Sequence, residues 1–307
     1  MHAPARDAFY AYVAPGPAPS PLWRLLAGLA LVLAFWVAWT VAVMLAVVAW
    51  RTSDGVTTRM AVDWIGRLLR GDTPAGVALA LATFAGIWPG VWLAQRLLHG
   101  EGLSRLFSVE GRLARAPLLG GLAIGGLLYA LTLAAAVPLI GPPGRTGLEP
   151  ADWAPWLALL APLVLVQAGG EELIFRGYML RRLAEHSLSP WVWAVLPALL
   201  FGMLHWSSGL PGAGGALYVA GTALFGVAAA LLVWRTGGLA ASIGLHAGIN
   251  LPGLTLAALD GLLDGAQLWS YPARHAGTLL LIDTVAAGLL VTALLALPGG
   301  ASRRPPP

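Results

Sequence analysis

Long apolar segments are the feature that most limits what this chain can fold into. The first extends from Leu22 to Trp50, and Arg24 near its start is its single charged residue. A helix needs roughly 20 apolar residues to cross the hydrocarbon core of a bilayer, so this segment is long enough to span it. The segment is too long for a signal-peptide core and no small-residue cleavage site follows it, so we expect a membrane span.

Composition supports an integral membrane protein. Hydrophobic residues make up 58% of the chain and charged residues only 10%, whereas a soluble domain has about 25% charged residues. Cysteine is absent, which excludes disulfides, thiolate zinc sites and a cysteine nucleophile. All 18 basic residues are arginines, and they are scattered among connecting segments. We therefore expect no nucleic-acid partner, and a lysine-free, arginine-rich chain of this kind is typical of bacteria.

Eight apolar segments are predicted to cross the membrane as helices. They are residues 22–50, 74–98, 117–137, 152–182, 191–206, 216–234, 239–259 and 276–297. Pro89 should kink the second helix. Gly121 and Gly125, four residues apart, should let the third helix approach a neighbour closely.

Two further stretches have a charged face. In residues 56–70, apolar side chains such as Trp64 and Leu68 share one helical face, while Arg59 and Asp63 lie on the other. This pattern predicts a helix that lies on the membrane surface. Residues 101–115 form a second amphipathic, arginine-bearing stretch. The expected fold is thus an all-α integral membrane protein with about eight transmembrane helices and one or two interfacial helices.

The chain is predicted to have four parts. These are a flexible segment at 1–20, N-terminal membrane and interfacial helices at 21–114, a catalytic core at 115–260, and a final span with a polar tail at 261–307. Eight crossings put both termini on one side, and that side receives twelve of the 18 arginines when the connections alternate. Because arginine accumulates in cytoplasmic connections, both termini are expected in the cytoplasm.

Two adjacent carboxylates interrupt the fourth apolar segment. Glu171 and Glu172 point about 100° apart on a helix, so they cannot share one task. Arg176 lies four residues after Glu172, which is the spacing of an ion pair on one helical face. We therefore expect Glu172 and Arg176 to form a structural pair. Glu171 is left free, and an unpaired carboxylate within a membrane segment is a candidate functional group.

Three polar side chains on later segments are candidates to meet Glu171. His205 follows the pattern Phe-x-x-x-His that begins at Phe201, and His246 and Asn250 share one face of the seventh helix. At 1.5 Å per residue, Glu171 and His205 lie about 20 Å and 24 Å below the terminal side, and His246 and Asn250 lie about 12 Å and 18 Å below it. All four can therefore meet within one layer of the membrane.

The patterns Glu-Glu-x-x-x-Arg, Phe-x-x-x-His and His-x-x-x-Asn, in this order on successive apolar helices, resemble the CPBP intramembrane proteases. This family, also called Abi, includes the type II CAAX-processing prenyl endopeptidases, and the resemblance covers roughly residues 115–260. It implies an eight-helix fold with a cavity open to the cytoplasm. It also implies that Glu171 activates water with the help of His205, and that His246 and Asn250 bind the oxyanion.

The same residue types are compatible with two kinds of catalytic site, one without a metal ion and one with zinc. A desolvated glutamate can act as the base that activates water, and histidine and asparagine N–H groups can stabilise an oxyanion without any cofactor. Glu171, His205 and His246 are also a ligand set that could hold Zn²⁺. The preferred expectation is a metal-free endopeptidase of the bacterial cytoplasmic membrane that cleaves a membrane-embedded or lipid-anchored (CAAX-like) protein. A zinc metalloendopeptidase and a non-catalytic membrane partner or immunity protein of the same fold are the alternatives, and a transporter is disfavoured because no inverted repeat is found.

Four further residues in or near the motif-bearing segments and the eighth span have simpler explanations. Phe201 is expected to pack and shape the cavity. Asp283 lies about 10 Å inside the eighth span without an evident partner, and proximity to the interface is its expected explanation. Gln167 and Ser242, each one turn before a motif residue, are candidates to support the motif side chains.

Overall fold

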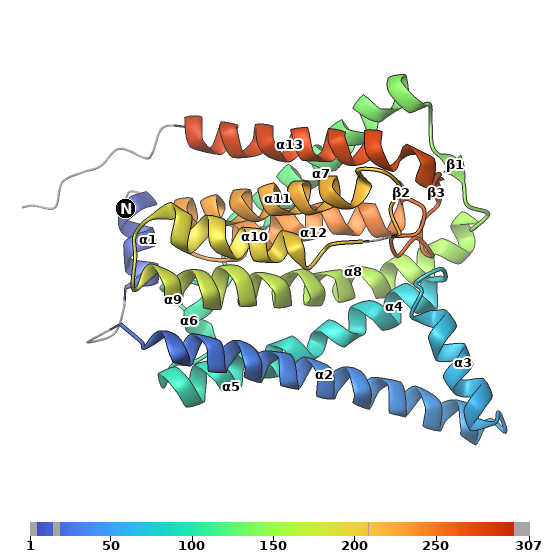
Figure 1. Ribbon diagram of the computed structural model, residues 1–307, viewed down its shortest axis with the longest axis horizontal. Helices are drawn as coiled ribbons and strands as arrows, with labels where there is room; N and C mark the ends of the chain where they lie inside the picture. The colour runs from blue at the N-terminus through green and yellow to red at the C-terminus, as the bar shows by residue number, and fades with distance from the viewer. Residues whose placement is uncertain (1–4, 15–18, 208, 298–307) are drawn as a thin grey trace, which may run out of the picture.

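The computed structural model describes residues 5–14, 19–207 and 209–297, and these residues form a bundle of helices with one small sheet (Figure 1). The α-helices are α1 (Ala5–Val13), α2 (Leu22–Ser53), α3 (Thr58–Leu68), α4 (Pro74–Thr83), α5 (Ile87–His99), α6 (Ser104–Phe107), α7 (Arg115–Ile140), α8 (Pro150–Glu172), α9 (Leu180–Ala184), α10 (Leu196–Met203), α11 (Gly214–Thr236), α12 (Ala240–Thr255) and α13 (Ala276–Ala296). The strands are β1 (Gly144–Arg145), β2 (Ala257–Leu259) and β3 (Trp269–Tyr271), in the order β1-β3-β2.

The predicted all-α membrane fold is confirmed. In the described part of the chain, six helical segments are long and apolar enough to cross a membrane. They are Leu22–Ser53, Pro74–His99, Arg115–Ile140, Pro150–Ala184, Gly214–Thr236 and Ala273–Ala296. The fifth and seventh expected spans form shorter helices, Trp191–Met203 and α12. These two shorter helices lead to or carry the histidine motifs.

Two predicted boundaries differ from the structure. The seventh helix ends at Thr255 rather than near Leu259, because β2 takes up the following residues and pairs in parallel with β3. The second interfacial helix, expected at 101–115, is reduced to the single turn of α6. Gly100 and Gly111 adopt left-handed conformations (φ 68° and 72°) on either side of it, and such glycines end helices.

The first amphipathic helix is found where it was predicted, and the second span is interrupted close to the proline that was expected to kink it. α3 is a separate helix that buries Ala61, Ile65 and Leu68. A 3₁₀ turn at Phe84–Gly86 separates α4 from α5, about one turn before Pro89. The regular α-helix of the second span is therefore interrupted in the region where proline removes a helical hydrogen bond.

The fourth span is one continuous helical segment from Pro150 to Ala184, as predicted. Proline in its first turn and Asp152 close behind it favour a helix start at this point. Directly after Glu172, residues Leu173–Met179 widen into a π-helix. Such insertions often occur at functional sites, and this one begins at the glutamate pair.

Close contact between α7 and α12 fixes the position of the second histidine motif. A Cβ atom on Gly121 would lie 2.1 Å from the carbonyl oxygen of Ala241, and one on Gly125 would lie 2.4 Å from that of Leu245. Any larger residue at either position would push the helices apart. The predicted role of this glycine pair is confirmed, and its partner helix is the one that carries His246 and Asn250.

Both described ends of the chain lie at the same end of the bundle, and the small sheet lies at the other (Figure 1). α1 and the last turn of α13 are at the first end, which we call the terminal end. We call the opposite end, with β1, β2 and β3, the sheet end. The shared location of the two chain ends agrees with an even number of membrane passes.

Candidate active site

Glu172 is enclosed at the junction between α8 and the π-helix. Its side chain has no exposed surface, and its Oε1 lies 3.0 Å from Nη1 of Arg176, which is 1% exposed. The expected ion pair is therefore present. Two buried charges stabilise a fold only when they are paired, so these two side chains depend on each other. The guanidinium of Arg176 also lies 4.4 Å from the ring centroid of Phe201.

His246 lies between the two glutamates. Its Nδ1 is 3.0 Å from Oε1 of Glu172, and its Nε2 is 3.4 Å from Oε2 of Glu171. The imidazole is buried, and the aromatic rings of Phe201 and Phe225 meet it edge-on. The contact with Glu172 fixes the orientation of the ring and turns Nε2 toward Glu171.

A chain of amide hydrogen bonds links Asn250 to Glu171. Nδ2 of Asn250 donates to Oε1 of Gln167 at 3.0 Å, and Nε2 of Gln167 donates to Oε2 of Glu171 at 2.8 Å. Gln167 thus supports two motif residues at once. The expected supporting position of Gln167 is confirmed by these contacts. Ser242 donates to the carbonyl oxygen of Leu239 and is fully buried.

His205 lies just beyond the last turn of α10. Its Nδ1 is 2.8 Å from the carbonyl oxygen of Phe201, so a proton on Nδ1 is donated to the backbone. In that tautomer Nε2 is free to accept a hydrogen bond. The ring packs against Phe201 on one side and Tyr218 on the other, with ring centroids 4.6 Å and 5.7 Å away.

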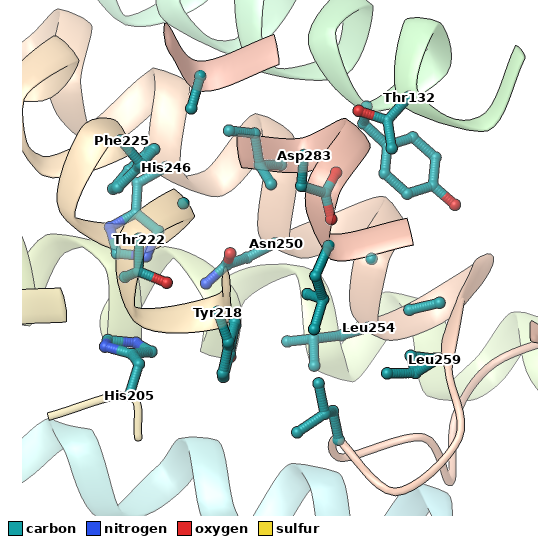
Figure 2. Close-up of a pocket in the computed structure, with 18 of the residues that line it drawn as sticks. Thr132, His205, Tyr218, Thr222, Phe225, His246, Asn250, Leu254, Leu259 and Asp283 are labelled. Carbon is teal, nitrogen blue, oxygen red and sulfur yellow. The ribbon is translucent and has the colours of Figure 1, made fainter. Parts of the chain in front are cut away.

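The candidate residues line one cavity of about 470 Å³. Glu171, His205, His246, Asn250 and Phe201 all reach it, and Figure 2 shows His205, His246 and Asn250 around it. Most of the remaining lining is aliphatic and comes from α7, α11, α12 and α13. A cavity of this size, with a few polar groups gathered in an otherwise apolar wall, is typical of a binding site.

The direction of the cavity differs from the expectation. Its lining includes Ala257 and Ala258 in β2 and Leu262 and Leu263 just after it, which lie at the sheet end. Among the described residues, none of the terminal-end connections (100–114, 185–190 and 237–239) contributes to the lining. The cavity therefore extends away from the chain termini, whereas it was expected to open on their side.

The alternative that the candidate residues hold Zn²⁺ requires their ligand atoms to lie close together. A protein zinc site brings three or four ligand atoms to about 2 Å from one point. Within the described ranges, no three His, Asp or Glu side chains converge closely enough to hold a metal ion. Glu171, His205 and His246, the candidate set, do not fit a metal ion as they are arranged.

Asp283 lines the cavity, which the sequence did not predict. It was expected about 10 Å inside the eighth span, with proximity to the interface as its explanation, and its carboxylate reaches the cavity from α13 (Figure 2). Tyr218 and Thr222 on α11 also line the cavity and were not singled out. Tyr218 and Thr222 belong to no spaced motif, so nothing in the sequence selected them. For Asp283 a signal was present, because a carboxylate well inside an apolar helix is a candidate functional group.

Part of the chain matches the model of a known protein family. Residues 152–252, about a third of the chain, match a family model described as type II CAAX prenyl endopeptidase Rce1-like. No match to the chain is found among curated proteins. The matched residues extend from the first turn of α8 into α12 and include all three motifs, a narrower range than the expected 115–260. This family supports a CAAX-type intramembrane protease. The family expected from the motifs is therefore confirmed for this segment: residues 152–252 match the Rce1-like type II CAAX prenyl endopeptidase family.

Proposed function

We propose that this protein is an intramembrane endopeptidase in which Glu171 activates a water molecule. The observation that carries the proposal is the contrast between the two adjacent glutamates. Glu172 is fully enclosed and paired, whereas the side chain of Glu171 is 12% exposed and lines the cavity. Only Glu171 can reach a substrate and a water molecule.

Water activation would use Glu171 and His205 together. Glu171 accepts a proton from water, and Nε2 of His205 accepts a hydrogen bond from the same water. The oxygen attacks the carbonyl carbon of the scissile peptide bond. The proton held by Glu171 then passes to the leaving nitrogen. Each step uses general acid–base catalysis by a positioned side chain.

The developing oxyanion would be held by His246 and Asn250. Nδ1 of His246 lies against Glu172 and Nε2 lies on the side of Glu171 and the cavity, so an N–H on Nε2 would be the donor to the oxyanion. The amide of Asn250 uses one of its two N–H donors on Gln167 and retains the other for the oxyanion.

The substrate would be a protein or peptide that is embedded in the bilayer or attached to it by a lipid. The aliphatic walls of the cavity suit an apolar segment, and they include parts of several helices that are long and apolar enough to cross a membrane. We further propose a bacterial cytoplasmic membrane with both termini in the cytoplasm, based on the distribution of arginine. In that orientation the sheet end, toward which the cavity extends, faces outward.

A cleavage assay on purified protein tests the proposal. Wild-type protein and the Glu171→Gln variant are incubated with peptides and membrane proteins, and new termini are identified by mass spectrometry. The wild type should produce termini that the variant does not. Equal cleavage by both would reveal a contaminating protease or a different nucleophile. Absence of cleavage across a broad substrate set would favour the non-catalytic partner of the same fold.

A further inference from the structure

One side chain, that of Gln167, is hydrogen-bonded to both halves of the proposed site. Gln167 lies on α8 one helical turn before Glu171, and it is buried. Its Nε2 donates to Oε2 of Glu171 at 2.8 Å, and its Oε1 accepts from Nδ2 of Asn250 at 3.0 Å. The proposed hydrolysis assigns water activation to Glu171 and oxyanion binding to Asn250. Gln167 therefore connects the proposed base directly to a proposed oxyanion donor.

The charge of Glu171 determines the direction of these two hydrogen bonds. A carboxylate only accepts hydrogen bonds, so Gln167 has to turn its NH₂ group toward Glu171 and its carbonyl oxygen toward Asn250. Asn250 then has to donate, because its own carbonyl oxygen in that place would face a second acceptor. This fixes which end of the Asn250 amide is the nitrogen. In Figure 2 that nitrogen lies on the side of His205 and His246.

The same contacts distinguish the two carboxylate oxygens of Glu171. Oε2 accepts from Gln167 and lies 3.4 Å from Nε2 of His246. Within the described ranges, no group is hydrogen-bonded to Oε1, so this oxygen remains to accept the proton of the attacking water. A proton on Oε1 leaves the hydrogen bond from Gln167 to Oε2 in place. The orientation of Asn250 therefore persists while the oxyanion exists.

We infer that Gln167 is a positioning residue that transmits the charge of Glu171 to the amide of Asn250, so that Asn250 presents an N–H group, not its carbonyl oxygen, to the substrate. This inference rests on the proposed function and deepens it. The oxyanion donor is held in its working orientation whenever the base is ionised and ready to accept a proton. A glutamine with a merely structural role would need one hydrogen bond in either direction, whereas this role needs both bonds in the direction observed.

Nuclear magnetic resonance of a single side chain tests the inference without any turnover. Asn250 is the only asparagine of the chain, so protein labelled with ¹⁵N-asparagine has one side-chain NH₂ signal pair. In the wild type, the proton bonded to Gln167 should be shifted downfield of the other. Gln167→Met keeps the length of the side chain but removes its donor and acceptor, and should abolish this difference. Gln95→Met is the matched control and should leave the pair unchanged, because the amide of Gln95 accepts from Arg182 at the terminal end.

Glu171→Gln tests whether the charge of Glu171 sets the direction. A neutral amide at this position both donates and accepts, so it no longer imposes one direction on Gln167. The Asn250 signals should therefore shift or split. In the Gln167→Met background the same change should have no effect on them. An Asn250 pair that is unchanged in Gln167→Met, or a response to Glu171→Gln that persists without Gln167, would overturn the inference.

Kinetics separate positioning from a general loss of stability. Gln167→Met should lower kcat by roughly 10²-fold, the lower end of the cost of losing one oxyanion donor, with little change in KM. In an Asn250→Ala background the same substitution should cost much less, because the two residues act together. A loss confined to KM, or one undiminished in Asn250→Ala, would contradict the role of Gln167. If the wild type cleaves no peptide, the proposed hydrolysis fails, and the Asn250 signals still decide this inference.

Discussion

Nδ1 of His246 and Nη1 of Arg176 both lie 3.0 Å from the same oxygen atom, Oε1 of Glu172. A single buried carboxylate oxygen therefore joins the ion pair of the fourth span to the imidazole of α12. Glu172 compensates the charge of Arg176 and at the same time orients His246. Its role in the site is wider than the structural pairing expected from the sequence.

Arg176→Ala should reduce stability more than Glu171→Gln does. Removing the guanidinium leaves Glu172 buried without its main counter-charge, and breaking a buried pair in this way typically costs about 3–5 kcal/mol. Glu171→Gln keeps the size of the side chain at a position that reaches the cavity, and should give a folded protein. Thermal unfolding in detergent measures both. The two roles would be reversed if the glutamine variant failed to accumulate while the Arg176 variant behaved normally.

The sequence predicted the motifs well because each is a local pattern. The i, i+4 spacing of Glu172 and Arg176 and that of His246 and Asn250 follow from helix geometry alone, and the structure contains the faces that this geometry requires. The two glycines on α7 predicted a close helix contact for the same reason, since only residues without a Cβ allow it.

Features that depend on tertiary packing could not be read from the sequence. The shared oxygen of Glu172 depends on how α12 rotates against α8, and no pattern within either helix encodes that rotation. The position of Asp283 depends on which face of α13 meets the cavity. The predicted ends of two helices were wrong because of the structure that follows or flanks them. The residues after α12 form β2, and left-handed glycines lie on either side of α6.

Alanine substitutions should separate the two proposed tasks of the site. Glu171→Ala and His205→Ala should each abolish peptide cleavage. His246→Ala should do the same, because this imidazole is an oxyanion donor and also contacts both glutamates. Asn250→Ala should retain residual activity, because one of two oxyanion donors remains and the loss of one costs about 3–4 kcal/mol. Initial rates on a single peptide measure these effects, with circular dichroism as a folding control. An inactive Asn250→Ala variant beside an active His246→Ala variant would contradict the assignment.

An ionic cluster at the terminal end should make stability depend on pH. Although burial raises the pKa of Glu101, the guanidinium groups of Arg182 and Arg181 outweigh it and hold this pKa below its ordinary value of 4.5. The lowered pKa means that the cluster stabilises the fold fully above pH 4.5, and that this contribution is lost as pH falls through the folded-state pKa.

Glu101→Gln should therefore unfold at a lower temperature than the wild type at pH 7. The difference between the two unfolding temperatures should shrink as the pH is lowered below 4.5. Glu110→Gln, an exposed change in the same connection, is the control and should show a small, pH-independent effect. A difference between wild type and Glu101→Gln that stays constant down to pH 3 would contradict this role of Glu101.

Cysteine labelling should establish the orientation in the membrane, and the cysteine-free chain is well suited to it. Ser187→Cys, in the connection after α9, should be protected from a membrane-impermeant reagent in intact cells. Thr146→Cys, next to β1 at the sheet end, should react with it. Labelling of residue 187 from outside would reverse the orientation derived from the arginines and would turn the sheet end, with the cavity, toward the cytoplasm.

Chelation should leave the proposed activity intact. Glu171, His205 and His246 do not converge as metal ligands, and the proposed mechanism uses Glu171 as a base. Activity should therefore survive prolonged treatment with a strong chelator, and metal analysis should find less than one equivalent per chain. A zinc site would behave differently, because a bound ion that is removed by chelation restores activity when it is added back. Stoichiometric zinc, with activity lost on chelation and recovered with Zn²⁺, would replace the glutamate base by a metal-bound water, and Glu171, His205 and His246 would become its ligands.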